Sequence, residues 1–312
     1  MTSTPTLDAV RGRGALRAVV SRGIRGLSLR GDDGRWVGLD TDVARAVAAA
    51  AVGDGEAVEW VSADPADRLT RLVAGEAELT VSNVSWTLGR EASVPVLFAG
   101  VTCYDGEGFL VRADSGITGP EQLAGQRVAV QAGTTSAANL ASWYGKRGLA
   151  VEPVAFPTPA ETLAAYADGA CAAYVLDRVA LAGERAALAD PGAHRILDTA
   201  ISREPMAAAV RDDDAAWFRL CRWVLQLLVS AEHQVEEVGE REKALAQAAE
   251  AAGPHGPAIG LDEDWAARVL AAVGTYADVY ERNLGPATGL NVPRGLNELF
   301  TRGGLQYAVP LH

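Results

Sequence analysis

The fold of this chain is decided by the stretch 127–177, which reads RVAVQAGTTSAANLASWYGKRGLAVEPVAFPTPAETLAAYADGACAAYVLD. Three short apolar runs within it predict strands at Arg127–Gln131, Val151–Phe156 and Ala172–Asp177. The two segments between them have the length and apolar spacing of helices, at Ala137–Gly145 and Pro159–Ala167. Thr158 before Pro159 is a typical helix start. Strands that alternate with helices predict a parallel α/β sheet.

The same alternation extends through the first two thirds of the chain. Further strands are predicted at Leu16–Val20, Ala57–Ser62, Glu78–Ser82, Gly108–Arg112 and Met206–Arg211. Further helices are predicted at Asp42–Ala51 and Ala66–Ala74, the first of them capped by Asp40 and Thr41. Beyond residue 212 the pattern becomes helical, at Trp217–Val229, Glu237–Ala252 and Asp264–Glu281, and a tail rich in Gly and Pro follows.

Two loop-like segments suggest where the chain passes between lobes. Ala113–Gly119, rich in Asp, Ser and Gly, follows a predicted strand, and a second crossing is expected near Ile201–Pro205. Two crossings predict a discontinuous first lobe, residues 1–110 plus 206–312, and an inserted second lobe, residues 111–205. A length of 312 residues suits two such domains.

Composition excludes several classes of function. A formal charge of −12 argues against a nucleic-acid partner. There is no phosphate loop, metal-ligand spacing or nucleophile triad, so no metal or cofactor is expected. The three cysteines predict free, buried thiols and favour a reducing compartment. The start, Met1–Pro5, lacks the pattern of an export signal, so either a leader has been removed or the protein is cytoplasmic.

Three polar segments follow predicted strands, where open α/β sheets present ligands to amides and side chains. The first is Ser82–Arg90, in which small hydroxyls and an Arg suit a carboxylate. The second is Gln131–Thr135, in which Gly133 allows close backbone approach and two hydroxyls open a helix. The third is Tyr174–Asp177, a strand that ends in a carboxylate. Each is equally explained as helix capping, but together they predict a clamp for a zwitterion.

The chain resembles the family 3 solute-binding proteins, specifically the general L-amino-acid-binding type, over nearly its whole length. The matching stretches are Trp36–Asp42, Trp86–Arg90, Tyr104–Gly106, Gln131–Thr135, Ile201–Pro205, Glu281–Pro286 and the tail Pro293–Pro310. The tail, with Arg294–Asn297 and Gly303–Leu305, is the part most specific to this subtype. The resemblance implies an α/β periplasmic-binding-protein-like fold of type II, with two lobes, a hinge of two crossing strands and a helical C-terminal extension.

The resemblance also implies a function and a site. The protein is expected to be an extracytoplasmic monomer that closes on a free α-amino acid between its lobes and delivers it to an ABC permease. The residues implied to bind the ligand carboxylate are Ser85, Thr87, Arg90, Thr134 and Thr135. The ligand amine is implied to bind Asp177.

The sequence departs from the family where the side-chain pocket is expected. The family's first strand leads into an Asn-Pro-Gly-like loop, but Ser21–Leu27 carries two arginines instead. These favour either an acidic or phosphorylated ligand side chain or simple surface charge. The pocket is expected to contain Ser21, Arg22, Arg25, Trp86 and Glu107.

Two alternatives stay open at this point. Dehydratases that eliminate water from cyclic acids resemble this fold, so the chain is alternatively a cytoplasmic lyase. In that case Glu107 is the candidate acid or base, and otherwise it is a hydrogen-bonding residue of the hinge. The third alternative is a cytoplasmic amino-acid sensor. The sequence favours binding without catalysis.

Overall fold

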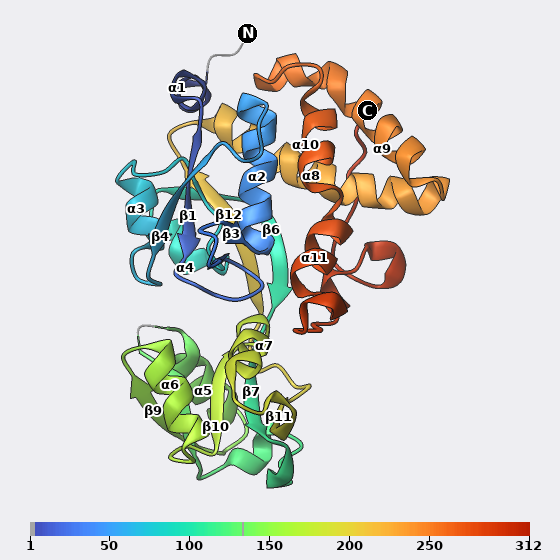
Figure 1. Ribbon diagram of the computed structural model, residues 1–312. Helices are drawn as coiled ribbons and strands as arrows, with labels where there is room; N and C mark the ends of the chain where they lie inside the picture. The colour runs from blue at the N-terminus through green and yellow to red at the C-terminus, as the bar shows by residue number, and fades with distance from the viewer. Residues whose placement is uncertain (1–3, 133) are drawn as a thin grey trace. The chain divides into compact units, whose positions relative to one another are not determined.

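The computed structural model describes residues 4–132 and 134–312, which fold into two compact units. Unit 1 comprises the chain up to Tyr104 together with Pro205–Thr288 and Pro293–His312. Unit 2 comprises Asp105–Glu204 and Gly289–Val292. Both are mixed α/β structures, as predicted (Figure 1).

Unit 1 contains a five-stranded sheet with the strand order β4-β1-β5-β12-β6. Its strands are β1 (Leu16–Ser21), β4 (Val58–Ala63), β5 (Leu79–Thr80), β6 (Val96–Asp105) and β12 (Glu204–Arg211). Strand β1 is parallel to both β4 and β5, whereas β12 is antiparallel to β5. The short strands β2 (Leu29–Arg30) and β3 (Trp36–Val37) form a separate hairpin. The parallel strands direct their carboxyl ends to one edge, where Ser21 and the segment after β5 lie.

Helix α2 (Leu39–Val52) is the central helix of unit 1, and every residue from Leu39 to Ala51 is buried. A helix that is buried on every side belongs in a core, and its six alanines allow close packing against its neighbours. It begins after Gly38, whose φ of 137° favours glycine. Asp40 and Thr41 therefore do not cap it, contrary to the prediction: the cap position is Gly38, and Thr41 Oγ1 donates to the Gly38 carbonyl at 2.8 Å.

The remaining helices of unit 1 surround this core. Three of them belong to the first part of the chain: α1 (Pro5–Arg13), α3 (Arg68–Val73) and α4 (Leu88–Ser93). The C-terminal group consists of α8 (Ala215–Val238), α9 (Arg241–Ala252), α10 (Trp265–Val273) and α11 (Tyr276–Leu284). Of these, α8, α10 and α11 pack against α2 (Figure 1). No helix in the described part of the chain has the length and apolarity needed to span a membrane.

The predicted helix Asp264–Glu281 is in fact two helices, α10 and α11. Gly274 adopts a φ of 79°, and Thr275 and Asp278 form a capping box that starts α11. A Gly followed by Thr-x-x-Asp is the sequence signature of a stop and a restart. The restart places Arg282 and Asn283 of α11 within hydrogen-bonding distance of α2.

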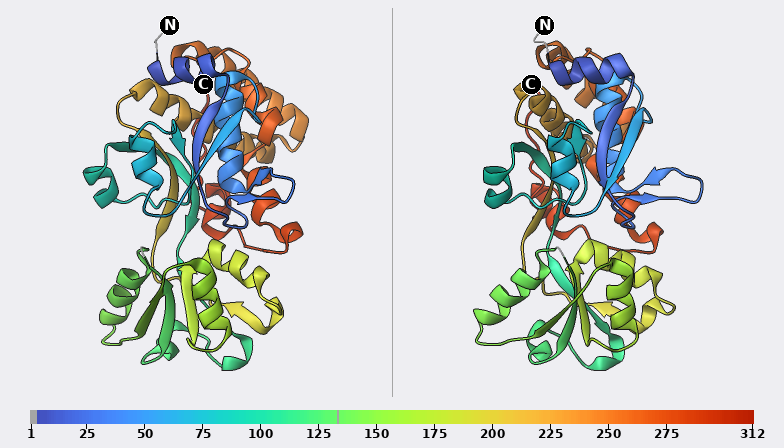
Figure 2. Two further views of the ribbon diagram at one scale, coloured as in Figure 1. Left: turned by 60° about the vertical axis from the view of Figure 1, so that its left-hand side comes forward. Right: turned by 90° about the vertical axis from the view of Figure 1, so that its left-hand side faces the viewer.

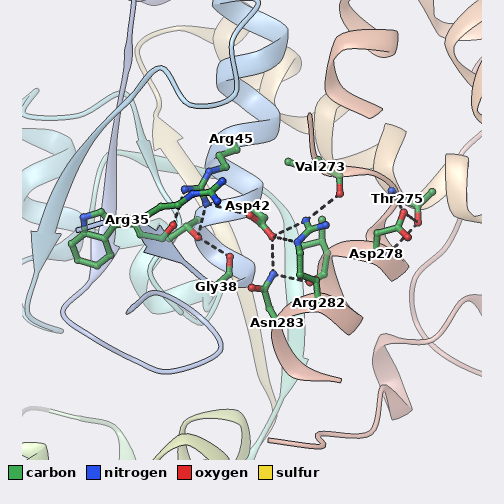
Figure 3. A network of polar contacts seen from close by, with 12 residues as sticks. Arg35, Gly38, Asp42, Arg45, Val273, Thr275, Asp278, Arg282 and Asn283 are labelled. Carbon is green, nitrogen blue, oxygen red and sulfur yellow. Dashed lines mark hydrogen bonds and ion pairs between the residues drawn. The ribbon is translucent and has the colours of Figure 1, made fainter. Parts of the chain in front are cut away.

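A polar network holds α11 to α2 (Figure 3). The Oδ2 atom of Asp42 accepts from Arg282 Nη2 at 2.7 Å and from Asn283 Nδ2 at 2.7 Å. Its other oxygen accepts from Arg45 Nη1 at 3.3 Å, and Arg45 also donates to the Trp36 carbonyl at 2.7 Å. The charges of Asp42 and Arg45 on the buried helix are thus neutralised by specific partners, as burial requires.

Unit 2 contains a second five-stranded sheet, with the order β11-β7-β10-β8-β9. Its strands are β7 (Glu107–Arg112), β8 (Arg127–Gln131), β9 (Glu152–Phe156), β10 (Ala173–Asp177) and β11 (His194–Ile196). Its helices are α5 (Ser136–Gly145), α6 (Pro159–Ala167) and α7 (Arg178–Ala187). Strands β8, β9 and β10 are parallel, whereas β7 runs antiparallel to β10 (Figure 2).

The two faces of this sheet bury alternate residues of its inner strands, β7, β8 and β10. On one face, Phe109, Val128 and Val175 pack with Trp143 and Tyr144 of α5. The other face buries the intervening residues Leu110, Ala129 and Tyr174 with Tyr166 of α6 and Leu181 of α7. Strands covered on both faces read as continuous apolar runs, which is why they were recognised in the sequence.

The borders of the units lie within strands. The chain leaves unit 1 between Tyr104 and Asp105 and returns between Glu204 and Pro205. The sequence placed the first border after residue 110, next to a loop-like segment. The structure instead runs directly from β6 to β7, so that composition gives no sign of the crossing. The three cysteines, Cys103, Cys171 and Cys221, are free and buried, as predicted.

Candidate functional site

The first predicted segment of the site follows β5 in unit 1. Val84–Trp86 is extended beside β12: Ala207 N donates to the Val84 carbonyl and Trp86 N to the Pro205 carbonyl, both at 2.9 Å. Ser85 is buried, and Trp86 stacks on Phe98 with ring centroids 5.8 Å apart. Backbone pairing and stacking therefore fix the segment that carries the predicted carboxylate ligands.

Thr87 and Arg90 are already organised around this segment. Thr87 is the N-cap of α4, and its hydroxyl accepts from Arg90 N at 3.2 Å. The hydroxyl keeps its own proton for donation. Arg90 Nη1 donates to the Ser85 carbonyl at 2.6 Å, so the guanidinium group lies beside Ser85. The structure thus brings together Ser85, Thr87 and Arg90. The capping role of Thr87 is compatible with its predicted role in binding a ligand carboxylate.

Asp40, which was predicted to cap α2, instead supports the start of this segment through Asn83. Asn83 has a φ of 45°, a left-handed conformation unusual for a residue with a side chain. Its N–H donates to Asp40 Oδ2 at 3.1 Å, and its side-chain oxygen lies 2.5 Å from Ser21 Oγ. Burial raises the pKa of Asp40 to about 7, although the Asn83 N–H and Arg68 act to lower it. Asp40 therefore holds the turn before Ser85 rather than capping α2.

Four of the residues predicted to form the side-chain pocket lie in unit 1: Ser21, Arg22, Arg25 and Trp86. Ser21 is buried and joined to Asn83, so the loop after β1 and the loop after β5 are neighbours. Arg22 and Arg25 are exposed. Arg22 lies 3.4 Å from Asp64, whereas Arg25 has no ion pair within residues 4–132 and 134–312. Trp86 remains 39% exposed although its ring stacks on Phe98.

In unit 2 the segment after β8 has a different local structure. Thr134 Oγ1 donates to the Gln131 carbonyl at 2.7 Å and lies 3.4 Å from Ser136 N. Thr135 occupies the N-cap of α5, is exposed and makes no side-chain cap hydrogen bond to the described residues. Gly133 lies outside the residues that the structure describes. Thr134 is thus committed to its own turn, and Thr135 presents its hydroxyl at a helix start.

Glu107 is buried and fully engaged. Its Oε1 accepts from Ser136 Oγ, and its Oε2 accepts from Asn139 Nδ2 at 2.8 Å. Asn139 also reaches Glu204 Oε1 at 3.2 Å. Burial raises the pKa of Glu107, as does the nearby Glu204, while the bonds from Ser136 and Asn139 lower it. Both oxygens of this carboxylate thus bind the start of α5, which is what a hydrogen-bonding residue of the hinge would do.

Asp177 stands at the start of α7, but Asp105 makes the hydrogen bond that caps this helix. Asp177 is the last residue of β10 and lies opposite Glu107 in the pairing with β7. It occupies the N-cap of α7, yet within the described chain its side chain makes no cap hydrogen bond. The cap is provided by Asp105, whose Oδ2 accepts from Val179 N at 2.9 Å. Burial raises the pKa of Asp105 to about 6. Asp177 is thus relieved of the capping role that the sequence left open.

The sequence analysis missed four supporting residues: Asp105, Ser136, Asn139 and Glu204. Asp105 and Glu204 lie in two of the stretches that match the family, Tyr104–Gly106 and Ile201–Pro205, and this match could have indicated them. The other two lie on α5, and their role depends on contacts with Glu107 that local patterns do not reveal. Among the described residues no His, Cys, Asp or Glu cluster is arranged to bind a metal ion.

Comparison with known proteins now supplies the family. The model of the bacterial extracellular solute-binding proteins, family 3, matches residues 16–286. The chain belongs to this family. The general L-amino acid-binding periplasmic protein AapJ of Rhizobium johnstonii is 35% identical to this solute-binding protein over 99% of the chain and 93% of the relative. The glutamate/glutamine/aspartate/asparagine-binding protein BztA of Rhodobacter capsulatus is 36% identical, over 99% and 94%.

A solved structure resembles the solute-binding protein over its whole length. It is a periplasmic binding protein of an ABC transporter from Brucella ovis, with glutathione bound. It is 37% identical, with a TM-score of 0.91, and the match covers 99% of this chain and 100% of the other. The lobed α/β fold and the helical C-terminal region are therefore those of the amino-acid-binding periplasmic proteins.

Proposed function

We propose that this solute-binding protein binds a free α-amino acid. In this proposal Ser85, Thr87 and Arg90 of unit 1 bind the ligand carboxylate with Thr134 and Thr135 of unit 2, and Asp177 binds the amine. The supporting observation is the hydrogen bond from Arg90 to the Ser85 carbonyl, which gathers three carboxylate ligands in one fixed segment. A guanidinium group and hydroxyl donors that are held in place before binding suit a carboxylate. The names of the relatives agree with such a ligand.

Calorimetric titration with a panel of L-amino acids tests this proposal. We expect Arg90→Gln to weaken binding about 100-fold or more, because a charge-assisted contact is lost. Arg71→Gln is the matched control, since Arg71 lies on α3 in the same unit and forms an ion pair with Glu76 at 3.5 Å, away from the proposed ligand residues in the sequence. Equal affinities of the two variants, or no binding of any amino acid to the natural protein, would refute the proposal.

We further infer that the ligand carries an acidic or amide side chain, or a γ-glutamyl group. Arg22 and Arg25 follow β1, next to the proposed carboxylate segment, and add positive charge where a side chain would extend. BztA is named for four amino acids with acidic or amide side chains. The Brucella protein holds glutathione, whose γ-glutamyl end carries a free α-amine and α-carboxylate. Glutamate, glutamine, leucine and glutathione therefore form the discriminating set, and Arg25→Ala should weaken the anionic ligands selectively.

We propose binding without catalysis. Glu107, the candidate acid or base of the lyase alternative, has both oxygens occupied by Ser136 and Asn139. Glu107→Gln should leave the ligand unconverted, as in the natural protein, when the mixture is followed by mass spectrometry. If the natural protein converts the ligand to a product of lower molecular mass and the variant does not, the lyase alternative is supported instead.

The same proposal includes a partner and a place of action. The protein would act outside the cytoplasm and deliver its ligand to an ABC permease, in keeping with the extracellular proteins of the family and with the Brucella protein of an ABC transporter. We also propose that it is a monomer. Cell fractionation tests the location, and light scattering after size exclusion tests the monomer. Ligand-dependent uptake with the cognate permease in vesicles would distinguish a transport protein from a cytoplasmic sensor.

A further inference from the structure

The C-terminal tail crosses between the units, which the sequence did not indicate. Gly289–Val292 belongs to unit 2, whereas the residues before and after it belong to unit 1. Leu290 is 1% exposed, and its carbonyl accepts from Arg185 Nη2 of α7 at 3.5 Å. Besides the crossings next to Tyr104 and Glu204, the chain therefore has a third connection between its units.

Shortly after this crossing, Asn297 of the tail binds β6, the strand through which the chain leaves unit 1. Asn297 is 3% exposed, and its side-chain amide pairs with the backbone of Tyr104. Tyr104 N donates to Asn297 Oδ1 at 2.7 Å, and Asn297 Nδ2 donates to the Tyr104 carbonyl at 2.9 Å. An amide side chain thus takes the place of a neighbouring strand at the last residue of unit 1.

The position of Asn297 is itself fixed. Arg294 makes a bidentate pair with Glu232 of α8, at 2.7 and 3.1 Å, and both side chains are 8% exposed. Arg294 also donates to the Asn297 carbonyl at 2.8 Å. The Tyr276 hydroxyl lies 3.1 Å from Asn297 Oδ1 and donates to the Thr102 carbonyl at 2.9 Å. Asn297 is therefore attached to rigid helices of unit 1 rather than to a free loop.

The chain is held on the other side of the border as well. Asp105 accepts from Gly106 N at 2.8 Å and from Val179 N at 2.9 Å, which ties the first residue of unit 2 to α7. Tyr104 is held by Asn297 and Asp105 is held by α7, so the backbone torsions that remain between these two contacts are those of Tyr104 and Asp105. A hinge motion is absorbed by a few residues at the ends of elements, so these contacts limit where and how far it can occur.

We propose that Gly289–Asn297 is a third hinge segment and that Asn297 is a positioning residue for ligand binding. By restraining Tyr104, Asn297 narrows the range of arrangements of the ligand-free protein, so that less conformational freedom is lost when the units close. This inference rests on the proposed function, in which both units bind one amino acid. The motif most specific to the subtype, Arg294–Asn297, acquires a role without touching the ligand.

The test measures the hinge with and without ligand. Spin labels at Thr70→Cys on α3 and Ala164→Cys on α6, both exposed, report the distance distribution between the units. Asn297→Ala should broaden this distribution in the free protein, and saturating ligand should bring it to that of the natural protein. The ligand Kd should rise about tenfold, because the freedom of one or two residues must be lost on closure.

A control and a second variant complete the design. Thr301→Ala removes a tail hydrogen bond to Glu236 on the surface and should change neither quantity. If Asn297→Ala fails to fold, Arg185→Ala removes the contact to Leu290 and should give a smaller change of the same sign. A purely structural role would lower the Tm and leave the distribution and Kd unchanged, and that result overturns the inference. Absence of ligand binding to the natural protein refutes the proposed function instead, while the distribution of the free protein still tests the hinge.

Discussion

Asp40→Asn should make the protein more stable at alkaline pH while preserving the turn that Asp40 supports. Asp40 is 1% exposed and accepts a hydrogen bond from Asn83 N at 3.1 Å. An asparagine has nearly the same shape, and its side-chain oxygen can accept the same bond. The substitution removes the charge that forms when the buried carboxyl ionises, at the expense of its attraction to Arg68.

The size of the effect follows from the pKa. Burial raises the pKa of Asp40 from 3.8 to about 7. The folded protein therefore holds a proton that the unfolded chain releases between these values, so this residue's contribution to stability is complete below pH 3.8 and is lost as pH rises through 7. One pH unit of difference in pKa corresponds to about 1.4 kcal/mol, which gives a loss of about 4 kcal/mol above pH 7.

Urea unfolding between pH 4 and pH 9 measures this contribution. The free energy of unfolding of Asp40→Asn minus that of the natural protein should increase with pH by about 4 kcal/mol and level off above pH 7. Other buried carboxyl groups affect both proteins alike and cancel in the difference. Asp32→Asn, an exposed site in unit 1, controls for net charge. A difference that is constant over this pH range would refute the assigned cause.

Three further substitutions, one of them with a matched control, test the structure. Gly38→Ala should prevent folding of unit 1, as judged by circular dichroism, because a Cβ there would lie 2.1 Å from the Leu27 carbonyl oxygen at a φ of 137°. Thr158→Ala should lower the free energy of unfolding by about 1 kcal/mol, since the capping box of α6 is lost; an unchanged urea midpoint would contradict that role. Arg282→Ala should lower the free energy of unfolding by about 2 kcal/mol, because the buried carboxylate of Asp42 loses a charged partner at 2.7 Å. Arg302→Ala is the control and should lower it far less, because Arg302 is 60% exposed and its partner Glu236 is less buried than Asp42.

The parts of the fold that follow local rules were predictable. The inner strands of unit 2, β7, β8 and β10, were recognised because both of their faces are buried, whereas the short edge strand β11 was missed. Helix α6 was recognised because Thr158 and Pro159 mark its start. Strand β6 was missed: Pro95 precedes it and Gly100 interrupts it, and both residues are typical of loops. Gly100 packs closely in the strand, since a Cβ there would lie 3.0 Å from Leu225 Cδ1.

The candidate site shows the same limit. Residue types at strand ends pointed to Ser85, Arg90 and Asp177, and these assignments stay predictions until they are tested. The contacts that support them join residues far apart in the chain, such as Asp40 with Asn83 and Asp105 with Val179. A local sequence pattern does not reveal contacts between distant residues. Asp40 was therefore interpreted as a helix cap, and Asp105 was noted as part of a family match but given no role.

The burial of Cys103, Cys171 and Cys221 has a practical consequence. Maleimide dyes react with thiolates, and burial raises the pKa of the Cys171 and Cys221 thiols, which keeps them protonated at neutral pH. A single cysteine introduced on the surface would therefore take up a fluorophore selectively, with the natural sequence otherwise intact. Conjugated beside Trp86, such a dye would report occupancy as a change in emission, and the protein would serve as a reagentless optical sensor for its ligand.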